Sequence, residues 1–102
     1  MAGVELDPII HQPVRLRIMA ALTALPPDAQ MEFVALRELL GVTDGNLGAH
    51  LRKLEEAGYV SIEKTFIARK PRTFIAATAR GRAAFERHVK ALREILGLGI
   101  AK

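Results

Sequence analysis

One short segment of the chain constrains its fold more than any other. In residues 35–40 the apolar side chains recur at helical spacing, and Gly41 follows where a C-terminal glycine cap is expected. Thr43 is a typical N-cap residue for a second helix, predicted over residues 44–57. Three leucines recur on that helix at spacings of four and three residues: Leu47, Leu51 and Leu54. Two amphipathic helices separated by Gly-Val-Thr predict a helix-turn-helix motif.

After this motif the apolar period changes from 3.6 to 2, which predicts strands rather than helices. Residues 59–63 and 73–77 each alternate in this way. Between them, residues 69–72 read Arg-Lys-Pro-Arg, so the pair is predicted to form a β-hairpin over residues 59–77 with a basic tip. A helix-turn-helix followed by a basic hairpin is the layout of a winged helix.

Helices are also predicted on both sides of this unit. Asp7-Pro8 and His11-Gln12-Pro13 each offer a start for the first helix, which is placed at about residues 13–25, before Pro26-Pro27. Residues 31–34 alternate and predict a minimal strand. Thr78 caps a last helix over residues 79–96, whose apolar stripe is wider than the rest of the unit could cover.

The predicted fold is therefore mainly α with a small β-hairpin. It is a single winged helix-turn-helix domain over residues 1–102, and its long last helix, with a wide apolar face, suggests packing against a second copy. A second copy would also help a chain this short to bury enough surface. The residues expected at the dimer interface are Ile9, Ile10, Phe85, Val89, Leu92 and Leu96.

The net charge of +4 is unevenly distributed along the chain. Residues 1–49 contain 3 basic and 6 acidic residues, whereas residues 50–102 contain 12 basic and 5 acidic ones. From Lys64 to Arg82 there are six basic residues and no acidic one. Such asymmetry favours a polyanionic partner. A solvated basic surface would have the same composition, so charge alone does not separate the two interpretations.

Several classes of protein are disfavoured by what the sequence lacks. The chain has no cysteine, which excludes disulfides, thiolate metal sites and a cysteine nucleophile and fits a reducing cytosol. No apolar run is long enough for a membrane span and no signal peptide precedes Asp7, so a cytoplasmic protein without membrane contact is expected. His11, His50 and His88 have no metal-like spacing. No catalytic motif or phosphate loop stands out, so no enzyme, metal or cofactor is expected.

Longer stretches of the chain resemble a known family. Residues 39–47 (LLGVTDGNL) and 50–60 (HLRKLEEAGYV) resemble the winged-helix transcriptional regulators of the MarR/ArsR-like group, particularly its short stand-alone subgroup. The resemblance continues through residues 11–18, 69–73 and 78–82. It implies a homodimeric transcription factor whose second motif helix enters the major groove of DNA. It also implies that the wing touches the adjacent backbone or minor groove, and that the first and last helices dimerise.

The predicted recognition helix can read DNA with the face opposite its leucines. Asparagine pairs with adenine and arginine with guanine, so direct readout should rest chiefly on Asn46, Arg52 and Lys53. The basic wing tip is expected to contact phosphates or the minor groove, although charges can also simply keep an edge strand soluble. The full set expected at DNA is Thr43, Asp44, Gly45, Asn46, Gly48, Ala49, His50, Arg52, Lys53, Arg69, Lys70, Arg72 and Thr73.

Three further features call for an explanation in the fold. Gly45 is expected to fit against the preceding helix, whereas Gly48, where related proteins commonly carry serine, is expected to let DNA approach closely. Asp44 is best explained as a first-turn acid that favours the helix dipole. Arg80 and Arg82 start a helix, where the dipole disfavours cations, so an anionic neighbour is expected, either DNA or an acidic side chain.

Two functions compete. The first is a sequence-specific transcriptional regulator that binds double-stranded DNA. The second is a winged helix used only as a protein-interaction module, with its basic surface on an acidic partner. A small-molecule effector is conceivable in the first case, because such dimers can hold a cleft between their lobes.

Overall fold

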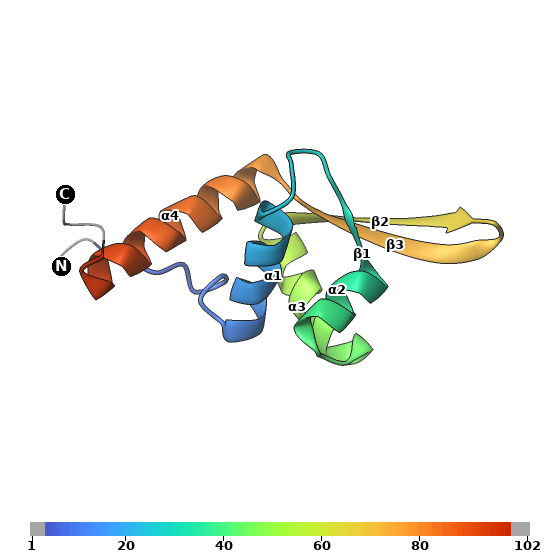
Figure 1. Ribbon diagram of the computed structural model, residues 1–102, viewed down its shortest axis with the longest axis horizontal. Coiled ribbons are helices and arrows are strands. Elements are labelled where there is room, and N and C mark those ends of the chain that lie inside the picture. The colour runs from blue at the N-terminus through green and yellow to red at the C-terminus, as the bar shows by residue number, and fades with distance from the viewer. Residues whose placement is uncertain (1–3, 99–102) are drawn as a thin grey trace.

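The computed structural model describes residues 4–98. These residues form α1 (Pro13–Thr23), β1 (Met31–Glu32), α2 (Phe33–Leu40), α3 (Asp44–Glu56), β2 (Val60–Ile67), β3 (Lys70–Ala77) and α4 (Ala79–Leu96). The strands make one antiparallel sheet in the order β1-β3-β2. Figure 1 shows the long β2–β3 hairpin projecting from one end of the molecule and α4 from the other, with the shorter helices packed between them. The predicted winged helix-turn-helix is confirmed.

The core lies where the helices meet the base of the sheet. Nine of its largest side chains are fully enclosed: Ile10, Ile18, Met19, Leu22, Leu36, Leu47, Leu51, Leu54 and Ile75. Burying one such side chain stabilises the fold by about 1.5–3 kcal/mol. Because three of the nine come from α3, this helix can rotate only at a large energetic cost, and its opposite face is fixed outward.

The predicted bounds of the first strand and of the helix that follows it are wrong. Helix α2 begins at Phe33, two residues earlier than expected, and β1 is only two residues long. The reason is that β1 pairs with β3 at Met31 and Glu32 alone, after which Phe33 turns into the helix and packs against the core. Helices α1 and α3 end within one or two residues of the expected positions, a difference typical of frayed helix ends.

The wing spans almost the predicted residues, but its two strands are longer than predicted. Strands β2 and β3 pair without interruption from Val60↔Ala77 to Ile67↔Lys70, so the expected four-residue tip is wrong. The tip is a two-residue turn at Ala68 and Arg69, both with positive φ, 53° and 68°. Pro71 is tolerated inside β3 because this part of the strand extends beyond β1 and has one free edge.

Helix α4 crosses the start of β2 at a glycine. A Cβ atom on Gly81 would lie 2.0 Å from the carbonyl oxygen of Tyr59, so only glycine fits there. The same carbonyl accepts a hydrogen bond from the backbone N–H of Thr78 at 3.0 Å. The Thr78 hydroxyl caps α4 by accepting from the Gly81 N–H at 2.9 Å and donates to the carbonyl of Gly58 at 2.7 Å. This junction fixes the direction of α4 relative to the wing.

Arg82 joins α4 to the end of α1. Its guanidinium donates to four backbone carbonyls at distances between 3.1 and 3.4 Å: those of Leu22, Thr23, Leu25 and Pro26. The expectation of DNA or an acidic side chain beside Arg82 is therefore wrong. Its neighbour is the carbonyl end of a helix, where the macrodipole is negative and the last carbonyls lack helical partners.

A buried polar chain ties the N-terminal segment to α4. His88 is 1% exposed, and its Nδ1 accepts a hydrogen bond from the backbone N–H of Asp7 at 3.2 Å. Because a backbone N–H can only donate, the neutral ring carries its proton on Nε2, which lies 3.3 Å from Nδ1 of His11. The carboxylate of Asp7 accepts from the Tyr59 hydroxyl at 2.5 Å. Burial, helped by His11 and opposed by Asp7, lowers the pKa of His88.

Substitution of two glycines by alanine should change stability in opposite directions. Gly81→Ala should lower the free energy of unfolding by roughly 1–3 kcal/mol, because its methyl group would overlap a backbone carbonyl. Gly45→Ala is the matched control, since its Cβ would meet nothing within 4 Å. It should raise stability by about 0.5–1 kcal/mol through helix propensity. Urea denaturation measures both, and equal effects would contradict the close approach at Gly81.

The lowered pKa of His88 makes stability depend on pH. The unfolded chain takes up a proton near the ordinary histidine pKa of about 6.5, whereas the native ring, whose pKa is lowered, takes it up only at lower pH. The free energy of unfolding should therefore be greatest above this pH and fall as the pH is lowered through it. The lowered pKa of His50 acts in the same direction. Replacing the ring by glutamine in His88→Gln should flatten the dependence in denaturation curves recorded between about pH 5.5 and 7.5. An unchanged slope would show that another group is responsible.

Candidate nucleic-acid interface

The turn between α2 and α3 forms as its sequence predicts. Gly41 ends α2 in the left-handed region with φ 69°. The Thr43 hydroxyl caps α3 by accepting from the backbone N–H of Asn46 at 3.1 Å. These local bonds set the angle at which α3 leaves α2 and place the first turn of α3 at the surface.

The face of α3 opposite its leucines is open to solvent. Leu47, Leu51 and Leu54 are at most 2% exposed. The exposed residues of the helix and its cap are Thr43, Asp44, Gly45, Asn46, Ala49, Arg52, Lys53, Glu55 and Glu56, with Gly48 and His50 half-buried at the margins. The residues predicted on this helix therefore share one accessible face.

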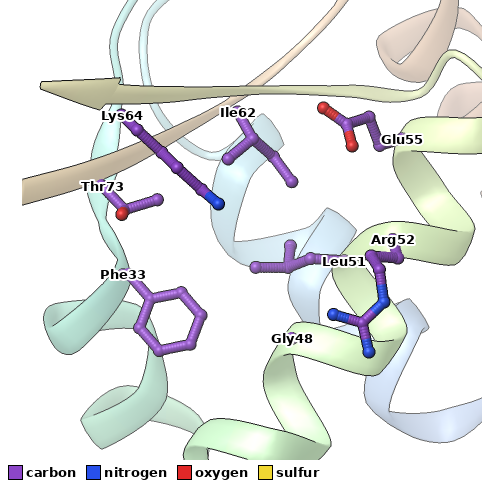
Figure 2. A pocket seen from close by; sticks show the side chains of 8 residues that line it. All are labelled: Phe33, Gly48, Leu51, Arg52, Glu55, Ile62, Lys64 and Thr73. Atoms are coloured by element: carbon purple, nitrogen blue, oxygen red, sulfur yellow. The ribbon is translucent and has the colours of Figure 1, made fainter.

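A hollow of about 680 Å³ separates α3 from the sheet. Figure 2 shows Arg52 of α3 and Lys64 of β2 reaching into it from opposite walls, with the backbone of Gly48 at its edge. The remaining lining residues are Phe33, Leu51, Glu55, Ile62 and Thr73. The hollow thus joins the predicted reading face to the wing, with two cations and the carboxylate of Glu55 on its walls.

Lys64 is a candidate contact that the sequence analysis did not single out. Its position two residues after Ile62, which packs against the core, places it on the inner face of β2. Continuing the period-2 alternation of β2 past residue 63 would have predicted that Lys64 faces the same side as Ile62. The sequence analysis ended the strand at residue 63 and therefore missed Lys64.

Both glycines of α3 face open space. A Cβ on Gly45 would meet nothing within 4 Å, and one on Gly48 would meet only Nη1 of Arg52, at 3.7 Å. The expectation that Gly45 fits against the preceding helix is therefore wrong. The first two turns of α3 present bare backbone on the accessible face.

Asp44 does not present a free negative charge at this surface. Its carboxylate accepts a hydrogen bond from Nη1 of Arg37 at 2.7 Å, across the turn between the two helices. This hydrogen bond is the main reason why the pKa of Arg37 lies above its ordinary value. The pairing reduces the repulsion that an acid would exert on a nearby phosphate.

His50 is held from behind by α1. Nη1 of Arg15 lies 3.1 Å from Nδ1 of His50, and Nε of Arg15 donates to the carbonyl of Ile9 at 2.5 Å. Because arginine can only donate, Nδ1 of His50 is the acceptor and the neutral ring carries its proton on Nε2. Burial first, and the charge of Arg15 second, lower the pKa of His50. Both effects favour the neutral ring, whose Nε2–H is then available as a donor.

The basic residues of the wing divide between its two faces. Arg72 points away from the hollow, and its guanidinium makes two hydrogen bonds to the carboxylate of Glu32, one of them at 2.8 Å from Nη2. This ion pair lowers the pKa of Glu32 and raises that of Arg72. Lys70 lies on the same face, Thr73 lines the hollow, and Arg69 is at the turn. Arg72, which the sequence predicts at DNA, lies in an ion pair that links β3 to Glu32 of β1.

The apolar face of α4 is only partly covered. Phe85, Val89 and Leu92 are half-buried, and Leu96 is 65% exposed. Of the two N-terminal residues expected at a dimer interface, Ile9 is half-buried, but Ile10 is fully enclosed by its own chain and has no exposed surface.

Within residues 4–98, no helix combines the length and hydropathy that a membrane span requires.

Comparison with known proteins agrees with this architecture. A family model described as a winged helix DNA-binding domain matches residues 14–96. An uncharacterised protein of Methanocaldococcus jannaschii is 42% identical over 81 residues, covering 79% of this chain and 85% of its own length. The structure of a transcriptional regulator homologue from Pyrococcus horikoshii is 34% identical, with a TM-score of 0.78 over 92% of this chain and 89% of that one.

A more distant structure shares the fold alone. It is the heme sensor protein PefR from Streptococcus agalactiae in complex with heme, which is 15% identical with a TM-score of 0.73 over 92% of this chain and 63% of that one. The match to the family model and the likeness to the Pyrococcus horikoshii structure show that the chain belongs to the winged-helix DNA-binding domain family of transcriptional regulators.

Proposed function

We propose that this protein is a sequence-specific regulator that binds duplex DNA as a homodimer. In this proposal α3 lies in the major groove, and the wing lies on the adjacent backbone or minor groove. The observation that carries it is the hollow of Figure 2, at which the open face of α3 meets the inner face of the wing. The two surfaces that DNA would touch are therefore continuous and held by one core.

Readout of bases would rest on few side chains. Asn46 and Arg52 are exposed on α3 and have the geometry to pair with adenine and guanine edges. Gly45, Gly48 and Ala49 offer no side-chain hydrogen bonds, but they let the helix backbone approach the groove closely. Contact with the DNA backbone and with its shape would then supply much of the specificity.

Affinity would come mainly from phosphate contacts. Lys64 on the wall of the hollow and Arg69 at the turn are exposed cations, and the sequence around them has no acid from Lys64 to Arg82. Each phosphate that such a cation neutralises releases counterions and makes the slope of log K against log salt more negative by about 0.9. A protein-interaction module would need none of this sequence-independent attraction to DNA.

Three arginine variants separate the roles of helix, wing and fold. Selection of bound duplexes from a random pool gives the site, and fluorescence anisotropy over a salt series measures affinity. Arg52→Ala should reduce discrimination at one base by about 1–3 kcal/mol. Arg69→Ala should weaken binding to all duplexes and reduce the salt slope by about 1. Arg72→Ala is the matched control, because this arginine pairs with Glu32 on the opposite face, and it should leave both quantities unchanged.

The outcomes of this experiment discriminate between the two functions. Failure of the wild-type protein to bind any duplex at low salt would eliminate DNA binding and favour the protein-interaction module. Binding with the effects of Arg52→Ala and Arg69→Ala exchanged would show that the roles of α3 and wing are assigned wrongly.

The dimer would form through the uncovered end of α4. Ile95, Leu96 and Leu98 are 48%, 65% and 69% exposed, which is a large apolar surface for one helix end. Leu96→Glu should shift the protein from dimer to monomer in sedimentation velocity. Leu39→Glu on α2, at a leucine that is 60% exposed, is the matched control and should not. A wild-type monomer at micromolar concentration, or dissociation by both substitutions, would contradict this interface.

A further inference from the structure

The tip of the wing exposes an aromatic side chain. Phe66 is 73% exposed, more than any other large hydrophobic residue in the described part of the chain. It lies one residue before the end of β2, far from the uncovered end of α4 that the proposed dimer would bury. A phenylalanine left in water at the end of a long hairpin contributes nothing to the core, so its position calls for an external partner.

The strand register places Phe66 on the face of the wing that continues the hollow. Ile62, Lys64 and Phe66 alternate along β2 and therefore point to one side of the sheet. Ile62 and Lys64 line the hollow beside α3. Phe66 stands about 7 Å beyond Lys64, at the strand rise of two residues. The side of the molecule that carries the open face of α3 thus ends in an aromatic ring.

Two cations lie near this ring. Arg69 is in the adjacent turn and Lys64 precedes Phe66 on the same face, whereas Lys70 pairs with Ile67 on the opposite face. Glu63, the nearest acid in sequence, lies on the opposite face of the strand and accepts a hydrogen bond from Gln30. An equally basic wing of a second copy would be repelled, whereas phosphate rims would be attracted. The minor groove combines such rims with apolar sugar walls and stacked bases.

The hairpin also holds Phe66 in place before any partner binds. Its ladder is continuous to the last pair, and Phe66 is directly opposite Pro71, whose ring restricts the backbone of β3. Phe66 would therefore lose little conformational freedom on binding, which favours insertion of the ring over loose contact.

We propose that Phe66 is an apolar wedge, which enters the minor groove beside the major groove that α3 occupies and partly unstacks one base step. Unstacking kinks the duplex toward the major groove, and flexible pyrimidine–purine steps should be preferred at that position. This inference rests on the proposed function, since it requires that the protein bind duplex DNA.

Two adjacent exposed residues provide the test. Phe66→Ala removes the ring on the inner face, and Ile67→Ala truncates an apolar neighbour, 46% exposed, on the outer face. Energy transfer between dyes at the two ends of the selected duplex measures its bend. The wild-type protein and Ile67→Ala should bend it by about 20–90°. Phe66→Ala should leave it nearly straight and bind it roughly 5- to 100-fold more weakly, and Phe66→Leu should restore part of the bend.

A fluorescent base distinguishes insertion from contact. 2-Aminopurine at the contacted step should brighten on binding of the wild-type protein and stay quenched with Phe66→Ala, because the base is unstacked only by the ring. Equal bends and equal affinities of wild type and Phe66→Ala would overturn the wedge while leaving the proposed function intact. Absence of duplex binding by the wild type would instead defeat the proposed function. Phe66-dependent binding to anionic lipid vesicles with an unchanged DNA bend would assign the ring to a membrane and also overturn the wedge.

Discussion

Burial of one leucine face of α3 is the constraint on which the remaining structure depends. Leu47, Leu51 and Leu54 enter the core shared with α1 and the sheet, and rotating them outward would expose three large apolar side chains. At about 1.5–3 kcal/mol each, their burial is comparable to the whole stability of a small domain. The polar side of α3 is therefore fixed before any DNA is present. In the proposed complex, this rigidity would compensate for the small number of α3 side chains that can contact bases.

A second constraint fixes the wing and α4 relative to the rest of the fold. The backbone of α4 meets that of Tyr59 at Gly81, while Arg82 bonds the carbonyl end of α1. The first contact lies where β2 follows α3 and the second holds α4 against the end of α1, so together they fix α4 relative to the hairpin and the helices. The buried bonds of His88 then attach the N-terminal segment to α4. The wing and α4 are thus both held by one junction. In the proposed dimer, this junction would hold the two copies of α3 at a defined spacing.

Features decided by neighbouring residues could be predicted from the sequence, and features decided by distant contacts could not. The Thr43 cap, the Gly41 turn and the leucine face depend on residues within a few positions, and all were predicted correctly. The contrast between Lys64 and Arg72 depends on strand register and on Glu32, which lies forty residues from Arg72. Both belong to one basic stretch, yet only Lys64 faces the hollow. The enclosure of Ile10 likewise depends on packing that local patterns do not encode.

The central claim is that one continuous surface, formed by the open face of α3 and the inner face of the wing, binds duplex DNA. Amide chemical shifts recorded by NMR during titration with the selected duplex test it most directly. The account predicts that the largest changes occur in residues 43–53 and 64–71, with small changes in the amides of the solvent-exposed face of α4. Large changes confined to α4, with α3 and the wing unaffected, would contradict it.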